Sequence, residues 1–442
     1  MDLWFLQAAR VMAGKRRSRR TGATTTLDEV VRAEADEDHA ADGLDPSLRL
    51  TIHLARGLLS YGMPAFRVED ALERLADALG FDIDVFCTPT ALIITLQNDA
   101  EARTRVVRVN PGGTDLERLS ALYELVGRVE RKELTSGDAA KRLETILARP
   151  SQLGRHGRSL AYGLVSATAA VLLGGGGLDI PFAALLGLLV GLLEAGAQKS
   201  PSLARLLPSI AAFVVSFAAT MIAVQGFAVR PSVLLLAPIM VLLPGLTLTT
   251  AMVELATAHL VSGTSRLMGA VVTFLQLGFG IAFGRHIAEL LPRVPRIAAA
   301  PELPWWVQLA APFAAAIGFS SLLKARAEDR VWVLFATAVA LGGSRLGGWL
   351  LGAELGAFVA ALIVATAAHA FSRFFDRPLA LILTPGILTL VPGSIGFLSV
   401  NSLLDGEVIE AISTAFRMLL VAMALAAGIL VATAAVPPRR SI

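Results

Sequence analysis

The chain holds little that metal or redox chemistry requires. Its 442 residues include one cysteine, Cys87, and six scattered histidines, which excludes an intrachain disulfide and a cysteine metal cluster and makes a zinc site or other cofactor unexpected. Charged residues make up 17% of the chain, whereas soluble proteins carry about 25%. The net charge of +3 is small and no stretch interleaves basic with aromatic residues, which argues against nucleic acid as a partner. The hydrophobic share of 55% instead indicates a lipid environment.

The few charges are unevenly divided along the chain. Residues 1–156 hold 22 Lys/Arg and 24 Asp/Glu, whereas residues 157–436 hold 15 and 12. This difference predicts a water-exposed part followed by a membrane part. Within the first part, residues 1–45 are basic and then acidic, and we expect them to be disordered. We expect no signal peptide, because the basic run follows the apolar stretch instead of preceding it.

Residues 46–156 are expected to form a soluble α+β domain. Apolar positions recur at helical spacing in two runs, with Pro64 suited to the start of the second helix and Gly80 to its end. The period then changes to alternation, which predicts three short strands between residues 81 and 109, followed by two helices near 115–132 and 137–149. No motif specific to catalysis occurs in this domain, and we expect no enzyme activity. An acidic face at Glu69, Asp70 and Glu73 fits either solvated surface or a docking surface.

The second part of the chain contains apolar stretches long enough to cross a bilayer. About 20 apolar residues span about 30 Å of hydrocarbon as a helix. We therefore predict an α-helical polytopic membrane protein with ten transmembrane helices. These are expected near residues 158–175, 180–198, 207–227, 232–250, 267–284, 305–323, 331–349, 353–371, 379–399 and 413–435.

The ten predicted helices form two groups that look like copies. A shift of 148 residues brings Pro244-Gly245 onto Pro392-Gly393, and the predicted spans coincide within a few residues. We expect a first five-helix repeat at 157–291 and a second at 305–436. A linker at 292–304 joins them, and a cytoplasmic tail at 437–442 follows the second.

The distribution of positive charge predicts the orientation of these helices. Cytoplasmic termini place thirteen Lys and Arg residues on the inside and six on the outside, as the positive-inside rule favours. Because each repeat has an odd number of crossings, the second is expected to run in the opposite sense. Inverted repeats are typical of secondary transporters, whose substrate binds near the midplane.

The substrate site is expected where prolines and glycines interrupt the fourth and ninth helices. An interrupted helix frees backbone amides, and the N-terminus of a half-helix suits a carboxylate. The alternative is a kinked, packed helix whose Ser and Thr side chains bond to the preceding turn. The candidate substrate-binding residues are Pro244, Gly245, Thr247, Thr249, Thr250, Thr384, Pro392, Gly393 and Ser394.

Two carboxylates are candidates for proton coupling, because ionisable groups at membrane depth are costly. Glu194 lies late in the second predicted helix, and Glu254 follows the first interruption. Glu194 fits equally a position at the headgroups, paired with Lys199. Weaker candidates are His259, His369, Gln276 and Glu354.

Three separated motifs resemble the threonine/serine exporter family. The soluble segment LLSYGMPAFRVEDALERLADALGFDIDVFCTPTALIITL is similar to its N-terminal signature, notably at Gly62, Arg67, Val68, Glu69 and Pro89-Thr90. PGLTLTTAMVELATAHLVSGTSRLMGA resembles its first membrane motif, and TPGILTLVPGSIGFLSVNSLL resembles its C-terminal motif. The first membrane motif often places an amide before an aspartate, and the corresponding residues here are Thr250 and Glu254, a departure that bears on substrate identity.

The resemblance implies export of threonine and serine across a bacterial plasma (inner) membrane, driven by proton antiport. The partners would be the small-molecule substrate, protons and the lipid bilayer, and a homo-oligomer is left open. One alternative is export of a small dicarboxylate such as succinate, which related two-component members transport. Another is a membrane-anchored enzyme or sensor that acts through the soluble domain.

Overall fold

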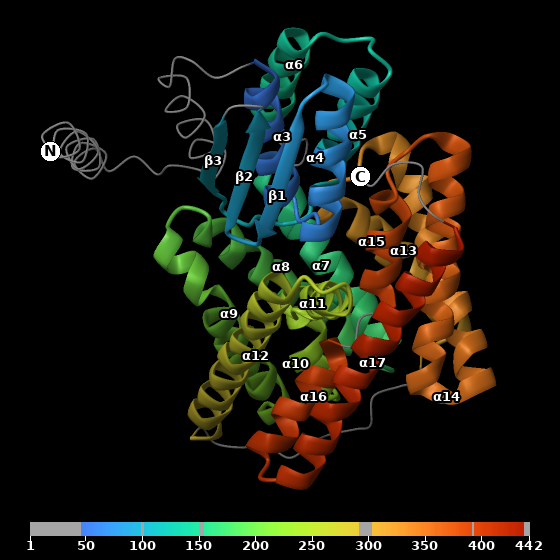
Figure 1. The fold of residues 1–442 in the computed structure, drawn as a ribbon. Coiled ribbons are helices and arrows are strands. Elements are labelled where there is room, and N and C mark those ends of the chain that lie inside the picture. Colours follow the sequence, from blue (N-terminus) through green and yellow to red (C-terminus); the bar gives the residue numbers. More distant parts are fainter. Residues whose placement is uncertain (1–45, 99–100, 150–153, 291–302, 391–392, 437–442) are drawn as a thin grey trace, which may run out of the picture.

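A small α+β domain sits on a bundle of long helices (Figure 1). The computed structural model describes residues 46–98, 101–149, 154–290, 303–390 and 393–436. The expectations for residues 1–45, for most of the 292–304 linker and for the 437–442 tail therefore lie outside the described residues.

The α+β domain has the predicted order of elements. Its three strands form an antiparallel sheet in the order β1-β2-β3, and in β1 the exposed Asp82 and Asp84 alternate with the buried Ile83 and Val85, as a sheet with one covered face requires. The third strand, which the apolar run at residues 105–109 predicts, begins four residues earlier, at Glu101. The elements are α3 (Pro46–Ser60), α4 (Ala65–Leu79), β1 (Asp82–Thr88), β2 (Ala91–Asn98), β3 (Glu101–Arg108), α5 (Leu116–Glu130) and α6 (Ser136–Ala148).

The helix ends in this domain follow from local chemistry. Pro64 precedes α4, and Gly80 ends the helix at φ 81°, where its N–H donates to the carbonyls of Ala76 and Asp77; glycine adopts this left-handed conformation without a Cβ clash. The Asp115 carboxylate accepts the N–H of Arg118 at the start of α5. The predicted helix start at Pro64 and helix end at Gly80 are confirmed.

The helical bundle follows the soluble domain in the chain. Apolar stretches form helices there because lipid leaves backbone polar groups no other partners. The elements are α7 (Arg155–Leu172), α8 (Asp179–Ala197), α9 (Pro201–Val224), α10 (Pro231–Ile239), η1 (Met240–Leu242), α11 (Gly245–Ala256), α12 (Leu260–Glu289), α13 (Trp305–Leu322), η2 (Ala327–Asp329), α14 (Arg330–Phe375), α15 (Ala380–Leu390), α16 (Gly393–Leu404) and α17 (Val408–Ala435).

The protein is a helical polytopic membrane protein, but the predicted count of ten spans is not confirmed. Within the described residues, eight helices are long and apolar enough to cross a membrane, or up to nine if the bent α10–α11 pair is one span. Helix α7 is not among them. Its first turn holds the polar residues Arg155, His156 and Arg158, which make it less apolar than its neighbours.

Helix α14 contains two spans separated by a glycine. Gly352 has φ 81° and ψ 176°, a conformation open essentially only to glycine. The candidate spans on either side are Ala327–Gly352 and Glu354–Phe375. The predicted division between spans at 331–349 and 353–371 is confirmed.

Helix α7 packs closely against α8 despite its polar start. A Cβ atom added at Gly191 would lie 2.7 Å from the Cα atom of Ser159, and one added at Gly187 would lie 2.1 Å from the hydroxyl of Ser166. Such contacts bring backbones together, as small residues do between membrane helices. Helix α7 is therefore an integral member of the bundle.

The core of the soluble domain continues into the bundle. Leu323, Phe371 and Leu379 belong to the same buried cluster as the soluble-domain core. The backbone N–H of Leu116 in α5 also donates to the carbonyl of Leu323, at 2.9 Å. The two parts share one apolar core at this junction.

Candidate functional site

The α10–α11 segment bends where proline and glycine were predicted to interrupt it. The two parts meet at an angle of 53°, with a short 3-10 turn before Pro244 and α11 beginning at Gly245. Proline has no N–H to continue the helical ladder. The predicted interruption at Pro244 is confirmed.

The corresponding segment of the second group is described on both sides of its Pro-Gly pair. Helix α15 ends at Leu390 and α16 begins at Gly393, while Pro392 lies outside the described residues. Pro385 lies inside α15, where its carbonyl accepts the hydroxyl of Thr389 at 2.8 Å.

A cavity of about 1350 Å³ lies between these two segments and the soluble domain. Six of the predicted substrate-binding residues line it together. Pro244 and Gly245 are not among the described residues that form its wall. The six residues are Thr247, Thr249 and Thr250 in α11, Thr384 in α15, and Gly393 and Ser394 in α16.

Most hydroxyls on this wall are available to a ligand. The hydroxyl of Thr249 donates to the carbonyl of Gly245 at 3.2 Å, as the alternative of a packed helix requires. Within the described part of the chain, the hydroxyls of Thr247, Thr250 and Thr384 have no hydrogen-bond partner. Because unpaired hydroxyls in a partly buried wall favour polar ligands, the wall fits a small polar solute.

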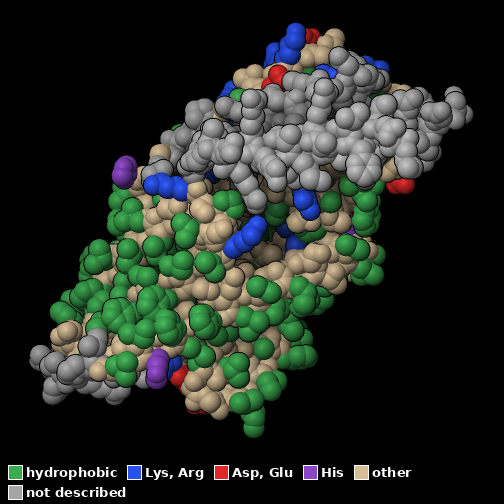
Figure 2. All heavy atoms as spheres, turned by 90° about the vertical axis from the view of Figure 1, so that its left-hand side faces the viewer, with side chains coloured by type: hydrophobic (Ala, Val, Ile, Leu, Met, Phe, Trp, Pro, Cys, Tyr) green, Lys and Arg blue, Asp and Glu red, His purple; other side chains and the backbone are tan. Residues whose placement is uncertain are grey.

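Cationic side chains dominate the charge around the cavity. One carboxylate, that of Glu194, is found among the described lining residues, against five cations. Figure 2 shows a hollow below the soluble domain with Lys and Arg side chains around it. Such a surface attracts carboxylates. The five cations are Arg67, Arg118, Arg158, Arg266 and Lys324.

Glu194 lines the cavity and is only half paired. Its Oε1 atom lies 2.8 Å from a guanidinium nitrogen of Arg158 and accepts the amide of Gln198, also at 2.8 Å. Its Oε2 atom is buried and has no partner within the described part of the chain. Its ionic partner is therefore Arg158, and not Lys199 as the alternative interpretation held.

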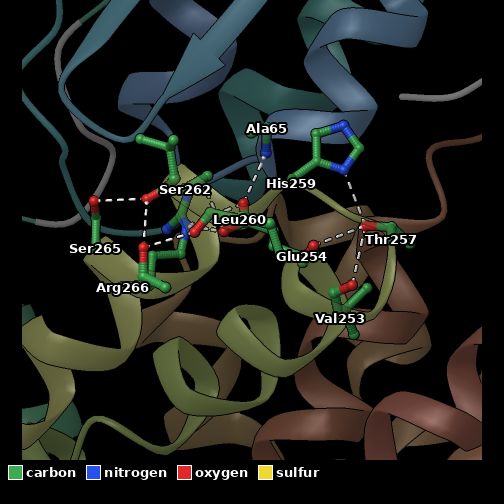
Figure 3. A network of polar contacts seen from close by, with 11 residues as sticks. Ala65, Val253, Glu254, Thr257, His259, Leu260, Ser262, Ser265 and Arg266 are labelled. Carbon is green, nitrogen blue, oxygen red and sulfur yellow. Dashed lines mark hydrogen bonds and ion pairs between the residues drawn. The ribbon is translucent and has the colours of Figure 1, made fainter.

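Glu254 is completely buried and joins the two parts of the protein (Figure 3). One carboxylate oxygen accepts the backbone N–H of Ala65 at 2.9 Å, at the start of α4 in the soluble domain. The other accepts the hydroxyl of Ser262 at 2.8 Å, and Arg266 contacts both oxygens at 3.0–3.1 Å. A carboxylate here satisfies a free amide at the positive end of the helix. Glu254 is not among the described residues that line the cavity.

A second polar contact lies beside this one. The His259 ring nitrogen Nε2 is 2.9 Å from a carboxylate oxygen of Glu69, and Nδ1 is 3.0 Å from the hydroxyl of Thr257. The other oxygen of Glu69 accepts the N–H of Cys87, whose thiol pKa is raised by burial. Glu69 and His259 thus form a docking contact between the soluble domain and the loop after α11, as one interpretation of the acidic face held.

The weaker sequence candidates lie away from the cavity wall. Gln276 donates to the carbonyl of Arg205, Glu354 pairs with Arg417 at 2.8 Å, and His369 lies 3.1 Å from the hydroxyl of Thr433. No group of three or more His, Cys, Asp or Glu residues within the described ranges is arranged to hold a metal ion.

The structure also reveals residues that sequence reasoning missed. Arg158 faces Glu194 from α7, and Ala65 meets Glu254 across 189 positions of the chain. No local pattern signals either contact, since neither has a short spacing in the sequence.

The fold and the cavity define a polytopic membrane protein with a polar site between interrupted helices. The model of the threonine/serine exporter family, ThrE, matches residues 49–288, and a second model of that exporter family, ThrE_2, matches residues 308–435. The chain therefore belongs to the threonine/serine exporter family.

Its curated relatives are fungal and match over a limited region. They include the uncharacterized protein C7D4.12c of Schizosaccharomyces pombe, 29% identical over 34% of this chain and 22% of its own length. Pheromone-regulated membrane protein 10 of Pichia sorbitophila is 29% identical over 33% of this chain and 16% of its own length. The chain thus spans about a fifth of these relatives. No solved structure matches it.

Proposed function

We propose that this protein is a secondary active transporter that exports threonine and serine. The observation that carries the proposal is the cavity, whose wall joins hydroxyls from α11 and α15 with cationic side chains. A free amino acid offers a carboxylate and polar groups that such a wall can bind. The family membership supports the same substrate class.

The transport mechanism we propose is alternating access between two inverted repeats of five spans, ten in all. Opposite helix directions support this arrangement. Arg149, six residues before α7, accepts a hydrogen bond from Arg118 of the soluble domain, whereas Leu323 meets the soluble domain just after α13 ends. Helix α7, the first of one group, thus runs away from the soluble domain. Helix α13, the first of the other group, runs toward it.

The interrupted segments are the proposed substrate site. In this proposal Thr247, Thr249, Thr250, Thr384 and Ser394 contact the solute, and Gly393 allows close approach at the start of α16. Pro244 and Gly245 act indirectly, by interrupting their helix, and Pro392, the third such candidate, lies outside the described residues. Hydroxyls without a partner among the described residues, at three of the threonines, support this assignment.

Proton antiport is proposed to pass through Glu194. Its unpaired buried oxygen and its place on the cavity wall support that role, because a carboxylate that exchanges protons needs access to the pathway. Glu254, the second candidate, has its oxygens occupied and lies off the wall, so it ranks below Glu194.

A small dicarboxylate such as succinate is the second candidate substrate. The excess of cations on the wall favours it, since each carboxylate of such a solute gains from a nearby guanidinium. We place the protein in a bacterial plasma membrane with both termini and the soluble domain on the cytoplasmic side.

Counterflow in proteoliposomes tests the proposal. The purified full-length protein is reconstituted, preloaded with unlabelled threonine, serine or succinate, and assayed for uptake of the labelled solute with and without a pH gradient. We expect threonine and serine to exchange and a pH gradient to drive their accumulation. Exchange of succinate alone would replace the first substrate by the second, and no exchange of any of the three would refute the proposed function.

A further inference from the structure

Arg67 is a soluble-domain residue that lies on the wall of the membrane cavity. It lies in the first turn of α4 and is 9% exposed. Arg67 is one of the described residues that line the cavity. A residue outside the membrane helices thus contributes to the proposed solute pathway.

Among the five cations on the wall, Arg67 stands out because it has no anionic partner within the described residues. Arg158 pairs with Glu194, Arg266 with Glu254, and both Arg118 and Lys324 with Asp115. Across the described ranges, the Arg67 guanidinium makes no hydrogen bond or ion pair. Its ring contact is with Phe66, whose centroid lies 5.7 Å from the guanidinium carbon.

The positive charge of Arg67 carries a free-energy cost because the side chain is buried. Burial lowers the pKa of Arg67 to about 10, against a smaller opposing influence of Asp70, so the guanidinium stays charged at neutral pH. An unpaired buried charge is unfavourable unless a counter-charge arrives. A carboxylate is the partner that the planar guanidinium binds best, through two parallel hydrogen bonds.

The loops around Arg67 also line the cavity and are packed against each other. The turn before α4 and the loop at 110–114 both line the same space. They are fixed to each other, since the N–H of Gly112 donates to the carbonyl of Ser60 at 3.0 Å. Gly62 has φ 86°, and a Cβ there would lie 3.2 Å from the hydroxyl of Thr114. The soluble domain therefore presents Arg67 on a packed surface.

We propose that Arg67 binds the carboxylate of the transported solute where the soluble domain lines the cavity. This inference rests on the proposed transport function and adds a substrate-binding residue from outside the membrane helices. The soluble domain is then part of the solute pathway, and the solute must carry a carboxylate to enter it.

Counterflow with full-length variants tests the role of Arg67. The probes are labelled L-threonine and, as a competitor without the carboxylate, L-threoninamide. We expect Arg67→Gln to raise the half-saturation concentration of L-threonine by about 10-fold or more, the scale of a lost charged hydrogen bond, and to remove the preference for the acid over the amide. Arg67→Lys retains the positive charge but not the planar guanidinium that makes two parallel hydrogen bonds, so it should recover part of the affinity. The control is Arg142→Gln, which removes an exposed arginine of α6 in the same domain and should change neither value.

A chemical measurement on the unaltered protein covers the case in which the variants fail to insert. Phenylglyoxal modifies accessible arginines, and mass spectrometry reads the modification at each site. L-threonine should protect Arg67 and leave Arg142 reactive, whereas L-threoninamide should protect neither. Equal modification of Arg67 with and without L-threonine would overturn the inference.

The outcomes separate this inference from the function on which it rests. A wild-type protein that exchanges none of threonine, serine and succinate refutes the transport function itself. If the wild type exchanges threonine and an inserted Arg67→Gln variant keeps the same half-saturation and the same preference for the acid, only the role of Arg67 is refuted.

Discussion

Glu194 and Glu254 lie in two neighbouring regions below the soluble domain, but their surroundings differ. Glu194 borders the cavity with one oxygen paired and one unpaired among the described residues. Glu254 is away from the cavity wall, is 0% exposed, and has donors at both oxygens. The side chain of Glu194 is 12% exposed and that of Glu254 is fully buried, so both acids are largely shielded from water and differ mainly in the donors around them. Our proposal that Glu194 takes part in transport and that Glu254 stabilises the junction is based on these donors.

The largest effect is a loss of stability expected at Glu254, whose carboxylate accepts from donors at both oxygens. Glu254→Ala removes the acceptor for Ala65 and leaves Arg266 without its counter-charge, and breaking a buried pair in this way costs about 3–5 kcal/mol. Thermal unfolding of the detergent-purified protein should show a large loss of stability. Glu407→Ala, at an exposed position before α17, serves as the control and should unfold like the wild type.

A double variant sharpens this prediction. Glu254→Ala with Arg266→Ala removes both charges, so part of the lost stability should return. An unfolding temperature for Glu254→Ala equal to that of the wild type would contradict the docking role of Glu254.

The next largest effect is a loss of proton-driven transport expected at Glu194, which borders the cavity. Glu194→Gln keeps the shape of the side chain and removes its titration, so we expect proton-driven efflux to be abolished while membrane insertion stays intact. Efflux from proteoliposomes with an imposed pH gradient measures the change, with Glu407→Gln as the matched control. Full retention of coupled efflux would remove Glu194 from the mechanism.

A smaller effect is expected from the hydroxyls on the wall. Thr250→Val and Thr384→Val keep the side-chain shape but each remove one proposed hydrogen bond to the solute. Such a bond is worth about 0.5–1.5 kcal/mol. The half-saturation concentration for L-threonine should rise by about 2- to 10-fold. Thr264→Val on the exposed face of α12 is the control, and an unchanged affinity in both test variants would place the solute elsewhere.

The smallest effect concerns the soluble-domain helix that Glu254 caps. The pKa of Glu73 is raised, first by burial and then by Asp70, Glu69 and other nearby acids. A raised carboxyl pKa means that the folded protein binds the proton more tightly than the unfolded chain, so ionised Glu73 disfavours folding at neutral pH. Glu73→Gln should raise the unfolding temperature slightly at pH 7, and the difference should vanish below the ordinary glutamate pKa. An equal difference at both pH values would contradict an electrostatic cause.

Local chemistry explains which features were predictable. Helix α4 begins after Pro64 and ends at Gly80, and α11 begins after Pro244, because these residues impose their conformation wherever they stand. Six residues chosen for their places beside the interruptions line the cavity, and their role in binding substrate stays a prediction.

Contacts between distant segments escaped prediction. Glu254 was assigned to proton coupling from its depth in an apolar sequence, and its partner Ala65 lies in another domain. Arg158 was not a candidate site residue, although it faces Glu194 from the first turn of α7. The same polar first turn separates α7 from the eight or nine candidate spans that length and composition identify among the described residues. These features depend on which helices pack together, which spacing along the chain does not encode.

The shared core at the junction determines how this protein can be dissected. Phe371, Leu379 and Leu381 are buried in the same cluster as the soluble-domain residues Leu58 and Leu122. Truncating the chain before the bundle would expose the apolar side chains of this shared cluster to water. The remaining fragment would then carry an exposed apolar patch that favours aggregation. Point substitutions that leave this junction packed are therefore better suited than truncation to measure what each part contributes.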